Sequence, residues 1–319
     1  MNTTEYAVIS PVWGWHLHEE MLLPGNVRIE MIGELDKISI KGWSEALNGE
    51  QIRALSNADF WFRYDFKSSG EPEAERNAKE LVRNTILACQ VVFPTGSHDS
   101  GSFLCVCEKH RETLVICSFS LNRRLQTASW ALTPFPPIDK QELVTVVEGV
   151  QEAFRKEVAR LVNPLCLLEL GEEANNSHMR LLQWVTGLDA LLIAEGRYDF
   201  ERNLSNLLGR RTYVFPPIDG VQPKYQVGDV ALDLYKLRDK IAHGLAIPKE
   251  FREITGFEDV GGKLIDGMYR YCQYRHVLEE AALFLLCSAL KTVFTRNLTE
   301  VVADLSTWRE YLMSPQPVT

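Results

Sequence analysis

Three side chains near residue 240 have the types and spacing needed to bind a phosphate and move a proton. They are Arg238, Asp239 and His243, within the segment LYKLRDKIAHG of residues 234–244. An arginine is always charged and can grip a phosphate with two parallel hydrogen bonds. A histidine changes charge near neutral pH and can act as a general base or acid. The segment therefore presents a fixed cation, a carboxylate and a titratable imidazole within about two helical turns.

The residues around these three predict a helix that would hold them on one face. Its apolar stripe follows helical spacing through Val230, Leu234, Leu237 and Ile241. Asp229 fits the N-cap position before the first turn of this helix, and Gly244 fits the C′ position just after its last turn. Asp239 and His243 are then i, i+4 neighbours that can touch. We expect this side of the helix to be open.

Further residues could bind RNA or a partner protein beside the three. Ala242 is small and would allow a partner surface to approach closely, and basic residues could provide local positive potential. The predicted binding residues are Tyr235, Lys236, Lys240, Ala242, Arg210 and Arg211.

A metal site is not predicted. His16 and His18 could supply two ligands, but no Cys, Asp or Glu cluster completes a site at a recognisable spacing. We expect no metal and no other cofactor.

Composition and charge limit the class of protein. The chain has 319 residues, 45% hydrophobic and 24% charged, which indicates a folded protein and favours two domains. The net charge is −9, and neither half of the chain is basic, so any contact with nucleic acid must come from a local site. The seven cysteines favour a reducing compartment, and the longest apolar run, residues 281–290, is too short to span a bilayer. We expect a cytoplasmic protein without a membrane partner.

The first part of the chain predicts a mixed α+β domain over residues 1–138. Alternating or aromatic-rich segments indicate strands, and a segment after Pro72 has helical spacing. The predicted strands are 27–32, 36–40, 59–66, 102–107 and 113–119, with a helix over 73–90.

The pattern changes after the proline-rich segment of residues 133–139. Beyond it, helical spacing dominates, which predicts an all-α domain over residues 139–319. The predicted helices are 140–162, 174–195, 200–211, 229–243, 267–296 and 299–312.

The helical domain resembles the HEPN family, and within it the Apea-like branch. The family motif is an arginine followed by a polar residue and, a few residues later, a histidine, which Arg238, Asp239 and His243 match. Upstream, residues 188–192 (LDALL) and 200–210 (FERNLSNLLGR) resemble the two preceding helices. The likeness covers residues 175–300 approximately, and we recognise no family for the N-terminal domain.

The resemblance implies an all-α HEPN-type bundle with metal-independent endoribonuclease activity. It also implies a homodimer in which the motifs of two protomers form one composite site, with Arg238, Asp239 and His243 as catalytic residues. Such domains commonly act in defence or toxin systems, where the N-terminal domain would serve as a sensor or regulator of unidentified ligand. The alternative is a non-catalytic HEPN module that binds RNA, a nucleotide or a protein partner.

Overall fold

The computed structural model describes eleven stretches of the chain, which form two compact units. One unit contains residues 1–90 and 95–148, and the other contains residues 91–94 and 149–319. The division between residues 148 and 149 falls within helix α4, Lys140–Arg155. The described residues are 4–12, 20–31, 60–94, 102–108, 111–119, 139–174, 176–215, 225–245, 258–259, 271–272 and 274–314.

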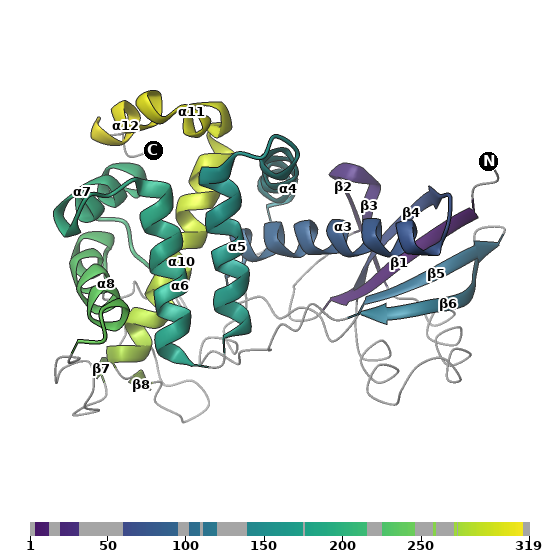
Figure 1. Ribbon diagram of the computed structural model, residues 1–319, viewed down its shortest axis with the longest axis horizontal. Coiled ribbons are helices and arrows are strands. Elements are labelled where there is room, and N and C mark those ends of the chain that lie inside the picture. Colours follow the sequence, from purple (N-terminus) through teal and green to yellow (C-terminus); the bar gives the residue numbers. More distant parts are fainter. Residues whose placement is uncertain are drawn as a thin grey trace. The chain divides into compact units, whose positions relative to one another are not determined.

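The first unit contains a six-stranded antiparallel sheet (Figure 1). This sheet confirms the prediction of an N-terminal domain that contains β-strands. The strand order is β2-β3-β4-β1-β5-β6, and each neighbouring pair runs antiparallel. The predicted strand over residues 36–40 lies outside the described residues. The strands are β1 Thr4–Val12, β2 Met21–Leu23, β3 Val27–Met31, β4 Phe60–Ser68, β5 Ser102–Glu108 and β6 Arg111–Phe119.

The central strand β1 was not predicted from the sequence. Residues 6–11 are all buried, so both faces of this strand are covered. A strand buried on both faces has no alternation of polar and apolar residues, and Pro11 within it argues further against a strand. The sequence pattern therefore gave no signal for the strand at the centre of the sheet.

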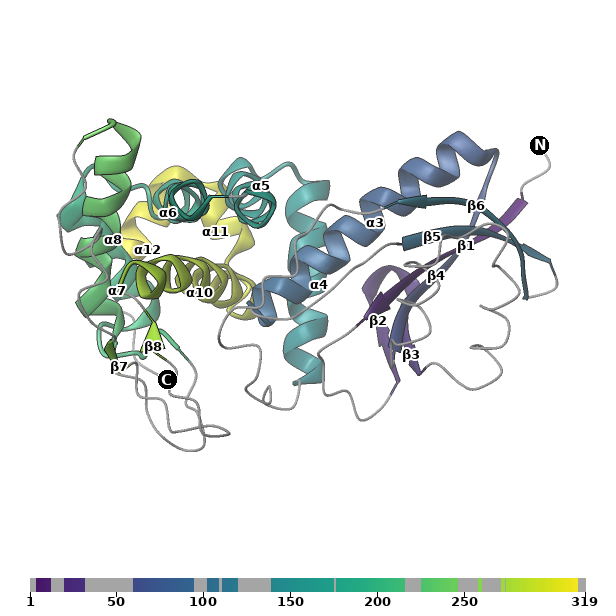
Figure 2. The same ribbon diagram turned by 90° about the horizontal axis from the view of Figure 1, so that it is seen from below.

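Helix α3, Glu71–Val92, lies along one face of this sheet (Figure 1 and Figure 2). The predicted start after Pro72 was placed two residues too late, because Pro72 itself lies in the first turn. Proline is well tolerated there, since the first amides of a helix have no partner within the helix.

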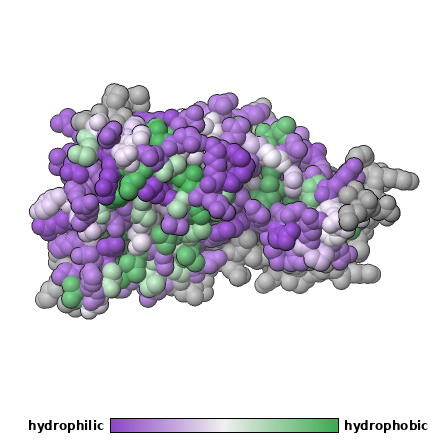
Figure 3. All heavy atoms as spheres, turned by 45° about the horizontal axis from the view of Figure 1, so that its top comes forward, coloured by the Kyte–Doolittle hydropathy of each residue, from purple (hydrophilic) through white to green (hydrophobic). Residues whose placement is uncertain are grey.

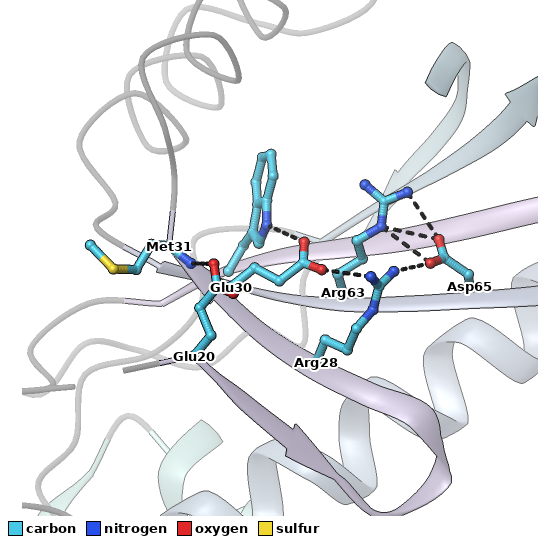
Figure 4. A network of polar contacts seen from close by, with 7 residues as sticks. Glu20, Arg28, Glu30, Met31, Arg63 and Asp65 are labelled. Atoms are coloured by element: carbon cyan, nitrogen blue, oxygen red, sulfur yellow. Dashed lines mark hydrogen bonds and ion pairs between the residues drawn. The ribbon is translucent and has the colours of Figure 1, made fainter. Parts of the chain in front are cut away.

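A charged cluster joins strands β3 and β4 on one face of the sheet (Figure 4). Arg28 lies directly opposite Arg63, and Asp65 accepts hydrogen bonds from both, at 3.1 Å from Arg63 Nε. Arg28 also pairs with Glu30 at 2.8 Å, and Glu30 accepts a hydrogen bond from Trp61 Nε1 at 3.2 Å. Two carboxylates thus balance two arginines that would otherwise repel each other across the strand pair.

The second unit is mostly helical, as predicted for the C-terminal half, although it also contains one short pair of strands that was not predicted (Figure 1). Besides the short strands β7 Glu258–Asp259 and β8 Tyr271–Cys272, its described elements are helices. They are α5 Ala159–Glu173, α6 Ser177–Leu192, α7 Arg197–Leu208, α8 Val227–Ala242, α10 Tyr274–Thr295, α11 Thr299–Ala303 and α12 Leu305–Met313.

Two of the predicted helices are each broken into two. The predicted helix over 140–162 ends at Arg155, and Glu157 adopts a left-handed backbone with φ of 52° before α5 begins. The predicted helix over 299–312 breaks at Asp304, whose side chain caps α12 by accepting a hydrogen bond from Thr307 N at 2.8 Å. Both breaks lack proline and glycine, so the sequence pattern ran through them.

The core of the helical unit lies between α5, α6 and α10. Trp184 of α6 is buried and donates a hydrogen bond from Nε1 to the Leu168 carbonyl oxygen of α5 at 3.2 Å. A Cβ atom at Gly171 would lie 2.1 Å from Trp184 Nε1, so only glycine permits this approach of α5 to α6. The close contact with α5 fixes the position of α6, and α6 carries Asp189, a residue of the site described below.

The surface drawn in Figure 3 is mainly hydrophilic, with smaller hydrophobic areas between the polar side chains. Exposed apolar side chains of the helical unit include Leu170 and Met179, which are 47% and 44% exposed. Over the part of the chain that the structure describes, no helix has the length and apolar character required to cross a membrane.

Candidate active site at the end of helix α8

Helix α8 is closed at both ends by local hydrogen bonds. At its start, Gln226 is the cap and Asp229 accepts a hydrogen bond from Gln226 N at 3.0 Å in a capping box. The predicted start at residue 229 was therefore two residues late, and the predicted cap Asp229 lies three residues after the actual one. At its end, Gly244 N bonds to Ile241 O at 3.2 Å and Leu245 N to Lys240 O at 2.9 Å.

These C-terminal bonds form a Schellman motif, which needs a left-handed residue after the helix. Gly244 has a φ of +61°, as the sequence pattern predicted for this position. His243 is consequently the C-cap residue that directly follows the helix, and its side chain is 66% exposed.

The apolar stripe of α8 faces the core. Val230, Leu234 and Leu237 are buried, and Ile241 is half-buried near the helix end. Asp239 and His243 lie on the exposed side, with their side chains 47% and 66% exposed.

Arg238 is less open than the sequence predicted, because its side chain is only 20% exposed. Its Nη2 donates a hydrogen bond to Asp189 Oδ2 of α6 at 2.9 Å, and its Nη1 to Asp239 Oδ1 at 3.3 Å. Its guanidinium carbon also lies 5.2 Å from the centre of the Tyr235 ring. Arg238 points from α8 toward α6, and Asp189 of α6 therefore occupies one side of the guanidinium group.

Asp189 is a site residue that sequence reasoning missed. Its side chain is 17% exposed, and burial raises the pKa of its carboxyl while the charge of Arg238 opposes the rise. The available signal was the carboxylate itself, set between Leu188 and Ala190 in an otherwise apolar helical turn. A carboxylate in such a place needs a partner, and here that partner is Arg238.

The end of α6 that carries Asp189 is firmly anchored. Trp308 of α12 donates a hydrogen bond from Nε1 to Leu191 O at 2.7 Å, and Asn203 of α7 donates one to Leu192 O at 3.0 Å. Both carbonyl groups belong to the last turn of a helix, where the helix itself supplies no donor. Asp189 is thus presented to α8 from a fixed backbone.

Two buried polar atoms remain unpaired within this ion pair. Among the described residues, neither Arg238 Nε nor Asp189 Oδ1 has a hydrogen-bond partner. The two residues therefore form one charged hydrogen bond where two parallel ones would be possible.

Asp239 connects the arginine with the histidine. The same oxygen, Asp239 Oδ1, lies 3.3 Å from Arg238 Nη1 and 3.7 Å from His243 Nε2. The longer distance permits an ion pair when the imidazole is protonated. The four side chains Asp189, Arg238, Asp239 and His243 thus form a continuous charged chain from α6 to the exposed end of α8.

Tyr235 supports this chain from one side. Its ring lies 5.3 Å from that of Phe200 of α7, and burial, with the nearby charge of Asp189, raises the pKa of its hydroxyl. Tyr235 is therefore a packed neighbour of Arg238, and its binding role stays a prediction.

The remaining predicted binding residues divide into two groups. Ala242 is exposed, and Lys236 and Lys240 are half-buried on the same helix. Arg210 follows α7, is 74% exposed, and pairs with Glu201 at 3.6 Å. Its side chain packs next to Gly228 at the start of α8, so Arg210 and the adjacent Arg211 lie about 15 Å along the helix from Arg238.

No metal centre accompanies these side chains in the described parts of the chain. Groups of three or more His, Cys, Asp or Glu side chains able to hold an ion are absent there. His16 and His18 lie outside the described residues.

Comparisons with known proteins do not assign the chain. No protein-family model, curated protein or solved structure matches it. The function is therefore argued from the site itself.

Proposed function

We propose that this protein is a metal-independent endoribonuclease and that its helical unit is a HEPN domain of the Apea-like branch. The proposal rests on one observation: Arg238, Asp239 and His243 adjoin one another at an exposed helix end, with Asp189 bonded to the arginine from behind. A fixed cation and a titratable imidazole side by side suit cleavage of a phosphodiester.

In this proposal, His243 accepts the proton of a ribose 2′-hydroxyl. The 2′-oxygen then attacks the adjacent phosphorus, and the bond from phosphorus to the 5′-oxygen breaks. The 5′-oxygen leaves with a proton from a general acid. The products are a 2′,3′-cyclic phosphate and a 5′-hydroxyl, and DNA is not cleaved because it lacks the nucleophile.

Arg238 would stabilise the charge that develops on the phosphate oxygens. Asp189 would hold the guanidinium plane, and Asp239 would orient the imidazole. The exposed side chains of His243 and Asp239 leave this end of α8 accessible to a substrate.

The general acid would come from a second copy of the chain. A composite site of two motifs requires a symmetric homodimer, and exposed Ala242 beside His243 permits two α8 helices to approach closely. Replacing Ala242 with Trp should then separate the protomers and lower cleavage together. Light scattering of wild type and variant, each with and without RNA, tests this arrangement.

A second candidate is a non-catalytic module that binds RNA, a nucleotide or a protein. One observation favours it: Arg238 is largely shielded and already bonded to two carboxylates. In that case the ion pair would serve mainly to join α6 to α8.

The two candidates differ in the products formed from RNA. Single-stranded RNA is incubated with the protein in EDTA, and the ends of any fragments are mapped, with DNA of the same sequence as the control. The nuclease proposal predicts cyclic phosphate ends on RNA and intact DNA. Intact RNA at every protein concentration would favour the binding module.

The N-terminal unit is proposed as a sensor or regulator within a cytoplasmic defence or toxin system. Its sheet-and-helix fold is separate from the helical unit that carries the site.

A further inference from the structure

Arg238 has two carboxylate partners that differ in accessibility. Asp189 is 17% exposed and bonds at 2.9 Å, whereas Asp239 is 47% exposed and bonds at 3.3 Å. A short bond to a shielded partner is harder to exchange than a longer bond to a solvated one. Asp189 is thus the permanent partner of Arg238, and Asp239 the exchangeable one.

The charge of the cluster disfavours an incoming phosphate. Asp239 interacts with Arg238, His243 and Tyr235 of α8 and with Asp189 of α6, and Arg238 is the fixed cation of this set. Among Asp189, Arg238, Asp239 and a neutral His243, two carboxylates therefore stand against one guanidinium. A phosphodiester adds another negative charge, which is favourable only where an existing anion moves away.

We propose that Asp239 occupies, in the free protein, the position that a substrate phosphate takes on Arg238, and that the substrate displaces it. This inference rests on the proposed function, because it assumes that the ligand is a phosphodiester. A phosphodiester has two non-bridging oxygens, so one of them can accept the hydrogen bond from Arg238 Nη1 in place of the Asp239 carboxylate oxygen. The displaced carboxylate stays within reach of His243, which lies 3.7 Å away before displacement.

Asp239 then has opposite effects on binding and on cleavage. As a competing anion it weakens substrate binding, and as the neighbour of His243 it aids the chemical step. Replacing it with asparagine should therefore tighten binding while slowing cleavage.

Binding is measured by fluorescence anisotropy with a labelled, 2′-fluoro-substituted single-stranded RNA, which cannot be cleaved. Removing a half-exposed competing charge should lower the Kd of Asp239→Asn by about three- to tenfold. Asp233→Asn is the matched control, because it removes the same charge from the same helix and should change the Kd by less than about twofold.

A double-mutant cycle identifies the group through which Asp239 acts. In an Arg238→Gln background, Asp239→Asn should give no gain in binding, because no guanidinium is left to release. An equal gain in that background, an equal gain from Asp233→Asn, or no gain at all would overturn the proposal. If Asp239→Asn binds more tightly but neither it nor wild type cleaves RNA, this inference is retained and the nuclease function is rejected. If wild type cleaves RNA but Asp239→Asn binds no more tightly, the nuclease function is retained and this inference is rejected.

Discussion

Arg238 of α8 donates a hydrogen bond to Asp189 of α6, a residue 49 positions earlier in the chain. The bond joins two helices at the point where α8 carries its exposed histidine. The same contact therefore contributes both to the stability of the helical unit and to the orientation of the proposed phosphate-binding group.

Replacing Asp189 with alanine should destabilise the protein. The change leaves a largely shielded guanidinium without its main partner, at a cost of about 1–3 kcal/mol, since both side chains keep some contact with solvent. Asp199→Ala is the control, because Asp199 pairs with the half-exposed Arg202 at 2.8 Å and should cost less than about 1 kcal/mol. Urea denaturation measures both, and equal losses would mean that the Arg238 pair is no more important than a surface pair.

Replacing Gly244 with alanine should cost about 1–2 kcal/mol through backbone strain alone. A Cβ at this position meets no described atom within 4 Å, but the φ of +61° is unfavourable for any residue with a Cβ. Gly196→Ala is a close control, because its Cβ is equally open while its φ of 170° is ordinary extended backbone. If thermal denaturation gave the same loss for both, the left-handed end of α8 would not be the cause.

Replacing Glu280 with glutamine should stabilise the protein at alkaline pH. Burial, with the nearby Glu279, raises the pKa of the Glu280 carboxyl to about 8, and within the described residues its Oε2 has no hydrogen-bond partner. The folded state therefore holds a proton that the unfolded state releases near pH 4.5. This group's contribution to stability is full below that pH and is lost as the pH rises to about 8, by an amount on the order of 5 kcal/mol.

The amide in Glu280→Gln does not titrate, so the variant should gain on wild type as the pH rises from 4.5 to 8. The free energy of unfolding, measured across this range, tests the expectation. Glu310→Gln, at an exposed position of α12, is the control and should follow wild type throughout. Parallel pH profiles for Glu280→Gln and wild type would show that Glu280 ionises freely in the folded protein.

The sequence predicted the elements whose burial pattern is regular. Strand β3 alternates between buried and partly exposed residues, and α8 buries Val230, Leu234 and Leu237 along one stripe, so both gave a clear period. Strand β1 is buried on both faces and has no such period. The helix is interrupted at Glu157 by a left-handed backbone conformation. Because this residue is not a glycine, the sequence gave no signal for the interruption.

The sequence predicted the site residues that belong to α8 and its end, but not the one that another helix contributes. Arg238, Asp239 and His243 share α8, so their spacing sufficed to place them together. The role of Asp189 depends on how α6 packs against α8, which no local spacing encodes. The shielding of Arg238 has the same origin, because it is the neighbouring helix that covers the guanidinium.

The most direct test of the central claim compares the cleavage rates of wild type, His243→Ala and His178→Ala on single-stranded RNA in EDTA. His178 is the matched control, because it is a partly exposed histidine at the start of α6. If His243 transfers the proton, its loss should lower the rate by about 10²–10⁴-fold while His178→Ala keeps the wild-type rate. Equal rates for wild type and His243→Ala would contradict the claim that this histidine performs the chemistry.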